Sequence, residues 1–235
     1  MLDCATLSCM TNNGYFHWIA IPALVLVMVL PGCSQASNAE DGSNQERAEN
    51  LIRMAGKSFA GGNFRKNADL LKEAAATDPQ NIRVWWKLCE AYQLTGELDL
   101  AVKACEQQLS LHPSSSSHNG LGLVYLAKKD SAKAASEFEK AAANTDDQSY
   151  YSNYVWSLLE SKQYERAIPV AQRLVELNKN DPHELKTAYH WLGIAYMKTG
   201  QKDKAQESVR LAYGKNCSMD KDDNVQCVGS PAKEQ

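Results

Sequence analysis

The sequence predicts an all-α protein built from about five stacked helix–turn–helix units. Aromatic, small and turn residues recur with a period near 34, and glycines fall mainly between helically periodic segments. The clearest copy reads Trp85-x2-Leu88-Cys89-x2-Tyr92, followed by Gly96 and, further on, by an alanine and a proline. Because one helix pair cannot cover its own apolar face, at least about three copies must stack into a solenoid.

Aligning the small residues places the five units at residues 48–81, 82–114, 115–147, 148–185 and 186–215. Their starts at 48, 82, 115, 148 and 186 are therefore 34, 33, 33 and 38 residues apart. Small residues let the paired helices approach closely. Gly96 and Gly200 are suited to a left-handed helix end. Asn67 and Val155 depart from the pattern, because most units have a small residue at their positions.

The period and residue order resemble the tetratricopeptide repeat (TPR) over residues 48–213. The resemblance implies a right-handed α-solenoid whose first helices line a concave groove for a protein or peptide. Carried over to this chain, the groove-facing positions are Arg83, Trp86, Lys87, Glu90, Asn119, Leu123, Asn153, Trp156, His190, Trp191 and Lys198. The family's clamp for C-terminal carboxylates has no counterpart here, because its Lys and Asn positions are Ile52 and Gly56.

Three groove positions carry tryptophan, which the packing pattern does not require: Trp86, Trp156 and Trp191. Exposed Trp and Arg dominate binding hot spots, so we expect at least two of the three to contact a ligand. The alternative is that they pack between neighbouring units. Trp85, one residue before Trp86, is predicted to belong to the packing frame instead.

The N-terminal segment differs in composition from the repeats. Residues 19–30 form an unbroken apolar run that is too short to span a bilayer but suits a signal peptide. Leu30-Pro31-Gly32-Cys33 resembles the bacterial lipobox, which implies a lipoprotein-type signal peptide over residues 1–32 and lipidation at Cys33. Ser34 then fits release to the outer membrane. The alternatives are a secreted or periplasmic protein without lipid, or a buried helix hairpin.

Two polar segments flank the repeats. Residues 33–47 lack large apolar side chains and are predicted to form a flexible tether, while residues 216–235 are predicted to be a polar C-terminal tail. The tail contains Cys217 and Cys227, for which a disulfide is the favoured interpretation in an export compartment. Cys89 and Cys105 fall on facing helices, where two buried thiols are favoured over a disulfide.

No catalytic or metal-binding pattern stands out from the repeats. His183-Glu184 lacks the second histidine of a zinc helix, because Thr187 occupies that position. Net charge is −3 with both signs mixed, so no basic stripe indicates nucleic-acid binding. We therefore expect no enzyme activity, no cofactor and no metal.

Taken together, the sequence predicts a non-enzymatic interaction scaffold, lipid-anchored on the periplasmic face of the outer membrane. It resembles TPR lipoproteins of pilus and secretion-system assembly. An adaptor for peptidoglycan enzymes is a second interpretation within the binding class. An enzyme with an unrecognised site is the alternative from another class.

Overall fold

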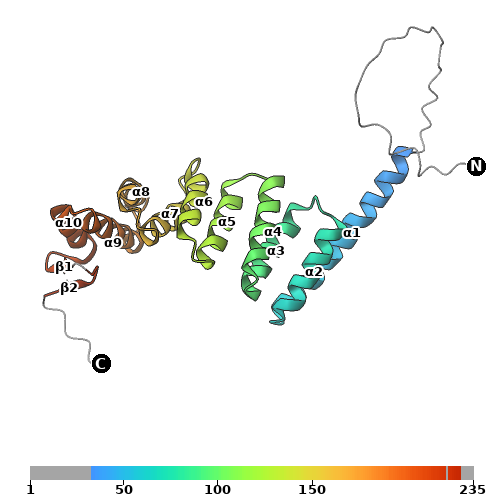
Figure 1. Cartoon of the computed structure of the whole chain (residues 1–235), viewed down its shortest axis with the longest axis horizontal. Coiled ribbons are helices and arrows are strands. Elements are labelled where there is room, and N and C mark those ends of the chain that lie inside the picture. The colour runs from blue at the N-terminus through green and yellow to red at the C-terminus, as the bar shows by residue number, and fades with distance from the viewer. Residues whose placement is uncertain (1–32, 221, 229–235) are drawn as a thin grey trace, which may run out of the picture. The chain divides into compact units, whose positions relative to one another are not determined.

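The computed structural model describes residues 33–220 and 222–228, the side chains from residue 42 onward, and shows ten helices and one two-stranded sheet there (Figure 1). The predicted signal peptide, residues 1–32, lies outside the described residues. Within the described ranges, none of the helices combines the length and the apolar character that a membrane span requires.

The helices form consecutive pairs, one pair for each predicted unit. The first helices are α1 (Cys33–Ala60), α3 (Ile82–Thr95), α5 (Ser115–Ala127), α7 (Gln148–Glu160) and α9 (Pro182–Lys198). The second helices are α2 (Phe64–Thr77), α4 (Leu98–Leu111), α6 (Ser131–Ala142), α8 (Tyr164–Leu177) and α10 (Lys202–Tyr213). From α2 to α10 each helix contacts the next, and α3 also contacts α5 as α7 contacts α9 (Figure 1). The fold is thus the predicted all-α solenoid.

A left-handed residue follows every first helix at the same place in the unit. The backbone angle φ is 74° at Gly62, 79° at Gly96, 62° at Lys129, 59° at Lys162 and 78° at Gly200. The left-handed ends predicted at Gly96 and Gly200 are confirmed. Lysine takes the same conformation in the third and fourth units, so the stacking of the helices imposes this turn even where a side chain disfavours it.

Small residues hold the paired helices together, as the repeat pattern predicts. Ala101, Ala134, Ala167 and Ala205 are completely buried. In the first unit the Asn67 amide takes the same position and donates a 2.9 Å hydrogen bond to the backbone carbonyl of Ala55. This bond satisfies a polar group inside the core, which explains how the first unit tolerates the departure.

The secondary structure expected for residues 33–47 is wrong, because these residues form the first part of α1 rather than a flexible coil. The segment holds no proline, and a helix already nucleated where Ala48 and Leu51 are buried can extend at little further cost. Residues 42–47 are exposed, so this part of α1 is a polar helical extension of the first repeat.

The segment predicted as a polar tail contains a short hairpin, which the sequence did not indicate, and the disulfide favoured between Cys217 and Cys227. Cys217–Met219 (β1) and Val225–Cys227 (β2) pair in antiparallel register, with Cys217 opposite Cys227, and a disulfide joins these two residues across 4.0 Å between Cα atoms. Cys217 and Met219 are buried with Val209 of α10. The hairpin therefore covers apolar surface of the fifth unit.

Candidate binding groove

The first helices of neighbouring units meet along one face, which we call the groove. Between α5 and α7, the amide Nδ2 of Asn153 donates to Oδ1 of Asn119 at 3.0 Å. Between α7 and α9, the rings of Trp156 and Trp191 lie 6.3 Å apart between centroids at an angle of 45°. Four of the residues predicted to face the groove are thus in contact across unit boundaries.

The groove is hollowed where the first three units meet. A hollow of about 400 Å³ has four of the predicted groove residues in its lining. Five further lining residues matter here, because they add apolar surface, an amide and a disulfide. The predicted groove residues in the lining are Trp86, Glu90, Asn119 and Leu123. The further lining residues are the apolar Phe59 and Leu94, the amide Gln93, and the disulfide-bonded Cys89 and Cys105. A hollow of this size and composition suits an apolar side chain with hydrogen-bonding neighbours.

Two prominent groove residues are absent from the sequence-predicted set. Phe59 is 51% exposed and Leu94 is 53% exposed, and both line the hollow. The repeat register could have found them, because with units starting at 48 and 82 they occupy the twelfth and thirteenth positions, which face the groove in the family pattern.

The adjacent residues Trp85 and Trp86 differ in burial: Trp85 packs against the core and Trp86 is exposed in the groove. The Trp85 indole donates a 2.8 Å hydrogen bond to the carbonyl of Pro79 and is partly buried against the core of the first two units. Trp86 is 40% exposed in the groove, with the Lys87 ammonium 5.1 Å from its ring centroid. Trp86 is therefore available to a ligand without loss of the packing that Trp85 provides.

Glu90 is the one carboxylate among the lining residues of the hollow. It lines both the main hollow and an adjoining one of about 160 Å³, which Lys87 also lines. Partial burial raises the pKa of the Glu90 carboxyl, and the positive charge of Lys87 opposes that rise. The groove thus presents a partly desolvated carboxyl group beside a lysine, within an apolar surround.

The sequence expectation of two buried thiols at Cys89 and Cys105 is wrong. The structure joins them by a disulfide between α3 and α4, with their Cα atoms 5.3 Å apart. Both residues are 1% exposed. Buried cysteines on facing helices look alike in sequence whether oxidised or reduced, and only their spatial approach distinguishes the two.

Of the eleven predicted groove residues, seven do not line the hollow, and three of these contact residues outside the groove. Arg83 forms an ion pair with Glu49 and lines a separate polar hollow. Lys198 forms a 2.9 Å ion pair with Asp223 of the C-terminal hairpin. His190 packs edge-on against Tyr213, with 5.7 Å between ring centroids. The end of α10 and the hairpin that follows it therefore contact α9, which the repeat pattern alone could not show.

His190 is predicted to make folding sensitive to mild acid. Burial lowers its pKa, Asp223 opposes this effect and Lys186 adds to it, and Nδ1 has no hydrogen-bond partner among the described residues. An unfolded histidine takes up a proton near pH 6.5 while the folded one resists, so stability falls as pH drops from about 6.5 toward the lower folded pKa. In urea unfolding between pH 7.5 and 5.5, His190→Phe should lose this component.

The matched control is His183→Gln, because the side chain of His183 is 86% exposed. This variant should keep the pH dependence of the wild type. An equal pH dependence in His190→Phe and wild type would contradict the assignment.

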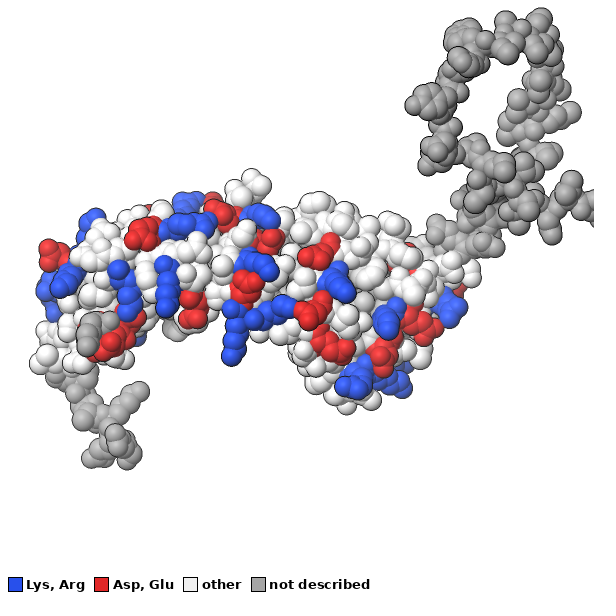
Figure 2. All heavy atoms as spheres, in the orientation of Figure 1, with Lys and Arg blue, Asp and Glu red and all other residues white. Residues whose placement is uncertain are grey.

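Charges of both signs are interspersed over the face that Figure 2 shows, between broad uncharged areas. In the described part of the chain, no group of three or more histidine, cysteine, aspartate or glutamate side chains is arranged to hold a metal ion. The groove, with its apolar and amide side chains, is therefore the candidate binding site.

Two segments match sequence models of the tetratricopeptide repeat, residues 58–123 and residues 187–214. These matches show TPR repeats in the two segments, and the helix pairs give the described residues the fold of a TPR solenoid. Proteins with this fold are typically interaction scaffolds that bind peptides or proteins. No curated protein matches the chain.

Several solved structures share the fold. A crystal structure of MamA protein aligns with a TM-score of 0.64 at 20% identity, covering 71% of this chain and 90% of that one. YrrB, described as a TPR protein with an unusual peptide-binding site, aligns with a TM-score of 0.61 at 16% identity, covering 77% and 89%. A putative kinesin light chain from Podosopora anserina gives a TM-score of 0.57 at 19% identity, covering 72% and 94%. At these identities the likeness shows the fold alone.

Proposed function

We propose that this protein is a non-enzymatic scaffold that holds a partner protein or peptide in its groove. The observation that carries the proposal is the series of exposed large apolar side chains on successive first helices, namely Phe59, Trp86, Leu94, Leu123 and Trp156. Trp and other aromatic residues on a rigid surface are typical binding anchors. The Asn119 and Asn153 amides between them can bond to a peptide backbone.

We further propose that Cys33 carries a lipid anchor that holds the scaffold at the periplasmic face of the outer membrane, where it assists assembly of a pilus or secretion complex. The lipobox-like sequence supports the anchor, and two disulfides are consistent with an export compartment. The role in assembly rests on the resemblance to TPR lipoproteins.

Trp156 offers the most direct test of the groove. A photo-crosslinking residue placed at Trp156 should capture a partner in native membranes, and the purified partner should bind Trp156→Ala about tenfold or more weakly than wild type, as hot-spot truncations do. Trp156 is 44% exposed, so its loss should leave the helical content unchanged.

Leu211 supplies the matched control, because it is a large apolar residue that is 55% exposed on a second helix, α10, whereas Trp156 lies on a first helix, α7. Leu211→Ala should bind like wild type. A folded Trp156→Ala protein with full affinity would remove Trp156 from the site.

The anchor is tested separately with Cys33→Ser. We expect this variant to move from the membrane fraction to the soluble fraction, because serine lacks the thiol that would carry the lipid. Fractionation followed by immunoblotting measures the change. Unchanged membrane partition would refute the lipid anchor while leaving the groove proposal intact.

A further inference from the structure

A second cleft, distinct from the groove, lies between the second helices of the first two units. We call it the outer cleft: α2 and α4 form its walls, α3 forms its floor, and its volume is about 450 Å³. Trp85 lies on the floor, Ala76 on the α2 wall, and Leu100 and Ala104 on the α4 wall. Leu100 is 39% exposed, so apolar surface remains open to solvent there.

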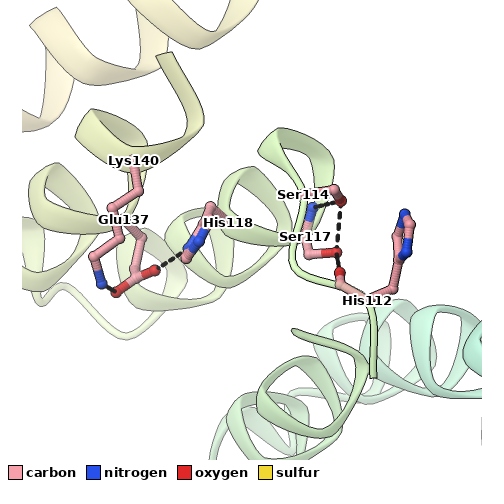
Figure 3. A network of polar contacts seen from close by, with 6 residues as sticks. All are labelled: His112, Ser114, Ser117, His118, Glu137 and Lys140. Carbon is pink, nitrogen blue, oxygen red and sulfur yellow. Dashed lines mark hydrogen bonds and ion pairs between the residues drawn. The ribbon is translucent and has the colours of Figure 1, made fainter. Parts of the chain in front are cut away.

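The third unit has ionisable residues at three positions where the outer cleft has uncharged ones. At 33 residues further along, Trp85, Ala104 and Gln107 correspond to His118, Glu137 and Lys140. There His118 Nδ1 lies 2.7 Å from one oxygen of Glu137, and Lys140 Nζ lies 2.7 Å from the other (Figure 3).

That network leaves the side chains of His118 and Glu137 only 20% and 12% exposed. The Glu137 carboxylate is thus bonded on both sides and largely buried in the third unit. Burial raises the pKa of Glu137, but the bonds to Lys140 and His118 oppose this effect and leave the pKa lowered. In the outer cleft, Ala104 stands at the position of Glu137 and supplies no carboxylate.

The walls of the outer cleft carry positive charge without an acid in the lining. Lys72 projects from α2 and Lys103 from α4, and the lining holds no aspartate or glutamate. Within the described residues, Lys72 has no hydrogen bond or ion pair, and the acid that senses Lys103, Asp99, is already bonded to Lys128. The cleft therefore offers an apolar floor between two cations.

We propose that the outer cleft binds an acidic amphipathic helix of a partner protein. Leu100, Lys103, Ala104 and Gln107 follow i, i+3, i+4, i+7 spacing, so the α4 wall extends over about two turns, roughly 10 Å. A helix of matching length places apolar side chains against Trp85 and Leu100, while its carboxylates reach Lys72 and Lys103. Small residues such as Ala104 permit the close approach.

The probe is a fluorescein-labelled amphipathic peptide of about fourteen residues, with leucines along one face and glutamates on both flanks. A twin peptide has lysine in place of every glutamate. Anisotropy titration of the full chain at low ionic strength should give saturable binding of the glutamate peptide and much weaker binding of the lysine peptide. Failure to saturate, or equal binding of the two peptides, would overturn the proposal.

Variants locate the binding. The double variant Lys72→Glu/Lys103→Glu should weaken the glutamate peptide about tenfold, because two partly exposed charge pairs become repulsive. Ala76→Phe, at an exposed position on the rim, should also weaken it by filling the cleft. Both replace exposed residues, and circular dichroism checks that each variant is folded.

Two controls complete the test. Lys179→Glu alters an exposed lysine outside the cleft, and Trp156→Ala alters the groove, so both should bind like wild type. If Trp156→Ala lost binding while Lys72→Glu/Lys103→Glu kept it, the peptide would be bound in the groove and the outer cleft would be excluded as its site. Failure of the outer cleft would leave the groove proposal untouched.

Discussion

Replacing Gly122 with alanine is expected to destabilise the protein by about 3 kcal/mol, the upper part of the range for overpacked cores. A Cβ at this position would lie 2.6 Å from Cε1 and 2.8 Å from Cδ1 of Phe138. Phe138 is completely buried, so its ring has no free space into which it can move. Alanine is the better helix former by about 1 kcal/mol, but that gain is smaller than the cost of the clash.

Gly120, on the same helix, is the matched control. A Cβ there would meet only the Cys105 sulfur at 3.8 Å, an ordinary contact, so Gly120→Ala should be neutral or slightly stabilising. Urea unfolding of both variants measures the difference. Phe138→Leu should recover part of the loss in the Gly122→Ala background. Equal stability of the two alanine variants would show that the helices separate without cost.

Removing the Cys89–Cys105 disulfide is expected to lower the free energy of unfolding by about 3 kcal/mol, from the loop-entropy relation for its sequence separation of 16. The bond ties α3 to α4, and both cysteines border the hollow of the groove. Cys89→Ala/Cys105→Ala should therefore unfold at lower urea concentration and also bind the groove partner more weakly.

Reduction provides an independent measurement. In dithiothreitol, the wild-type unfolding midpoint should fall close to that of the double variant in the same reductant, because both proteins then lack both bonds, and the double variant should respond to reductant only through the Cys217–Cys227 bond. Cys217→Ala/Cys227→Ala is the comparison for that second bond, whose loss should loosen the hairpin and leave the hollow intact. A wild-type midpoint unaffected by reductant would contradict the stabilising role of both bonds.

The repeat register predicted part of the groove, because groove-facing positions recur at the same places in each unit. The TPR resemblance implied that Trp86, Glu90, Asn119 and Leu123 face the groove, and these four residues line one hollow. Phe59 and Leu94 obey the same register, so the sequence carries the signal for these two residues as well. Local periodicity is informative here because each unit contacts mainly its neighbours.

The third and fourth units show where local rules give way to stacking. Lys129 and Lys162 adopt the left-handed conformation that Gly96 and Gly200 adopt, although nothing in a lysine predicts it. The helices on either side fix the turn, and the residue conforms at some cost in backbone strain.

By itself, the sequence determined the helix pairs, their number, and the division of Trp85 from Trp86, because these depend on spacing within and between adjacent units. Only the tertiary structure decided that Cys89 meets Cys105 as a disulfide and that the residues after α10 form a hairpin. It also decided that Lys198 is engaged by Asp223. These outcomes depend on which side chains approach in space at the end of the solenoid or across a pair, and a repeating pattern carries no signal for contacts that occur once.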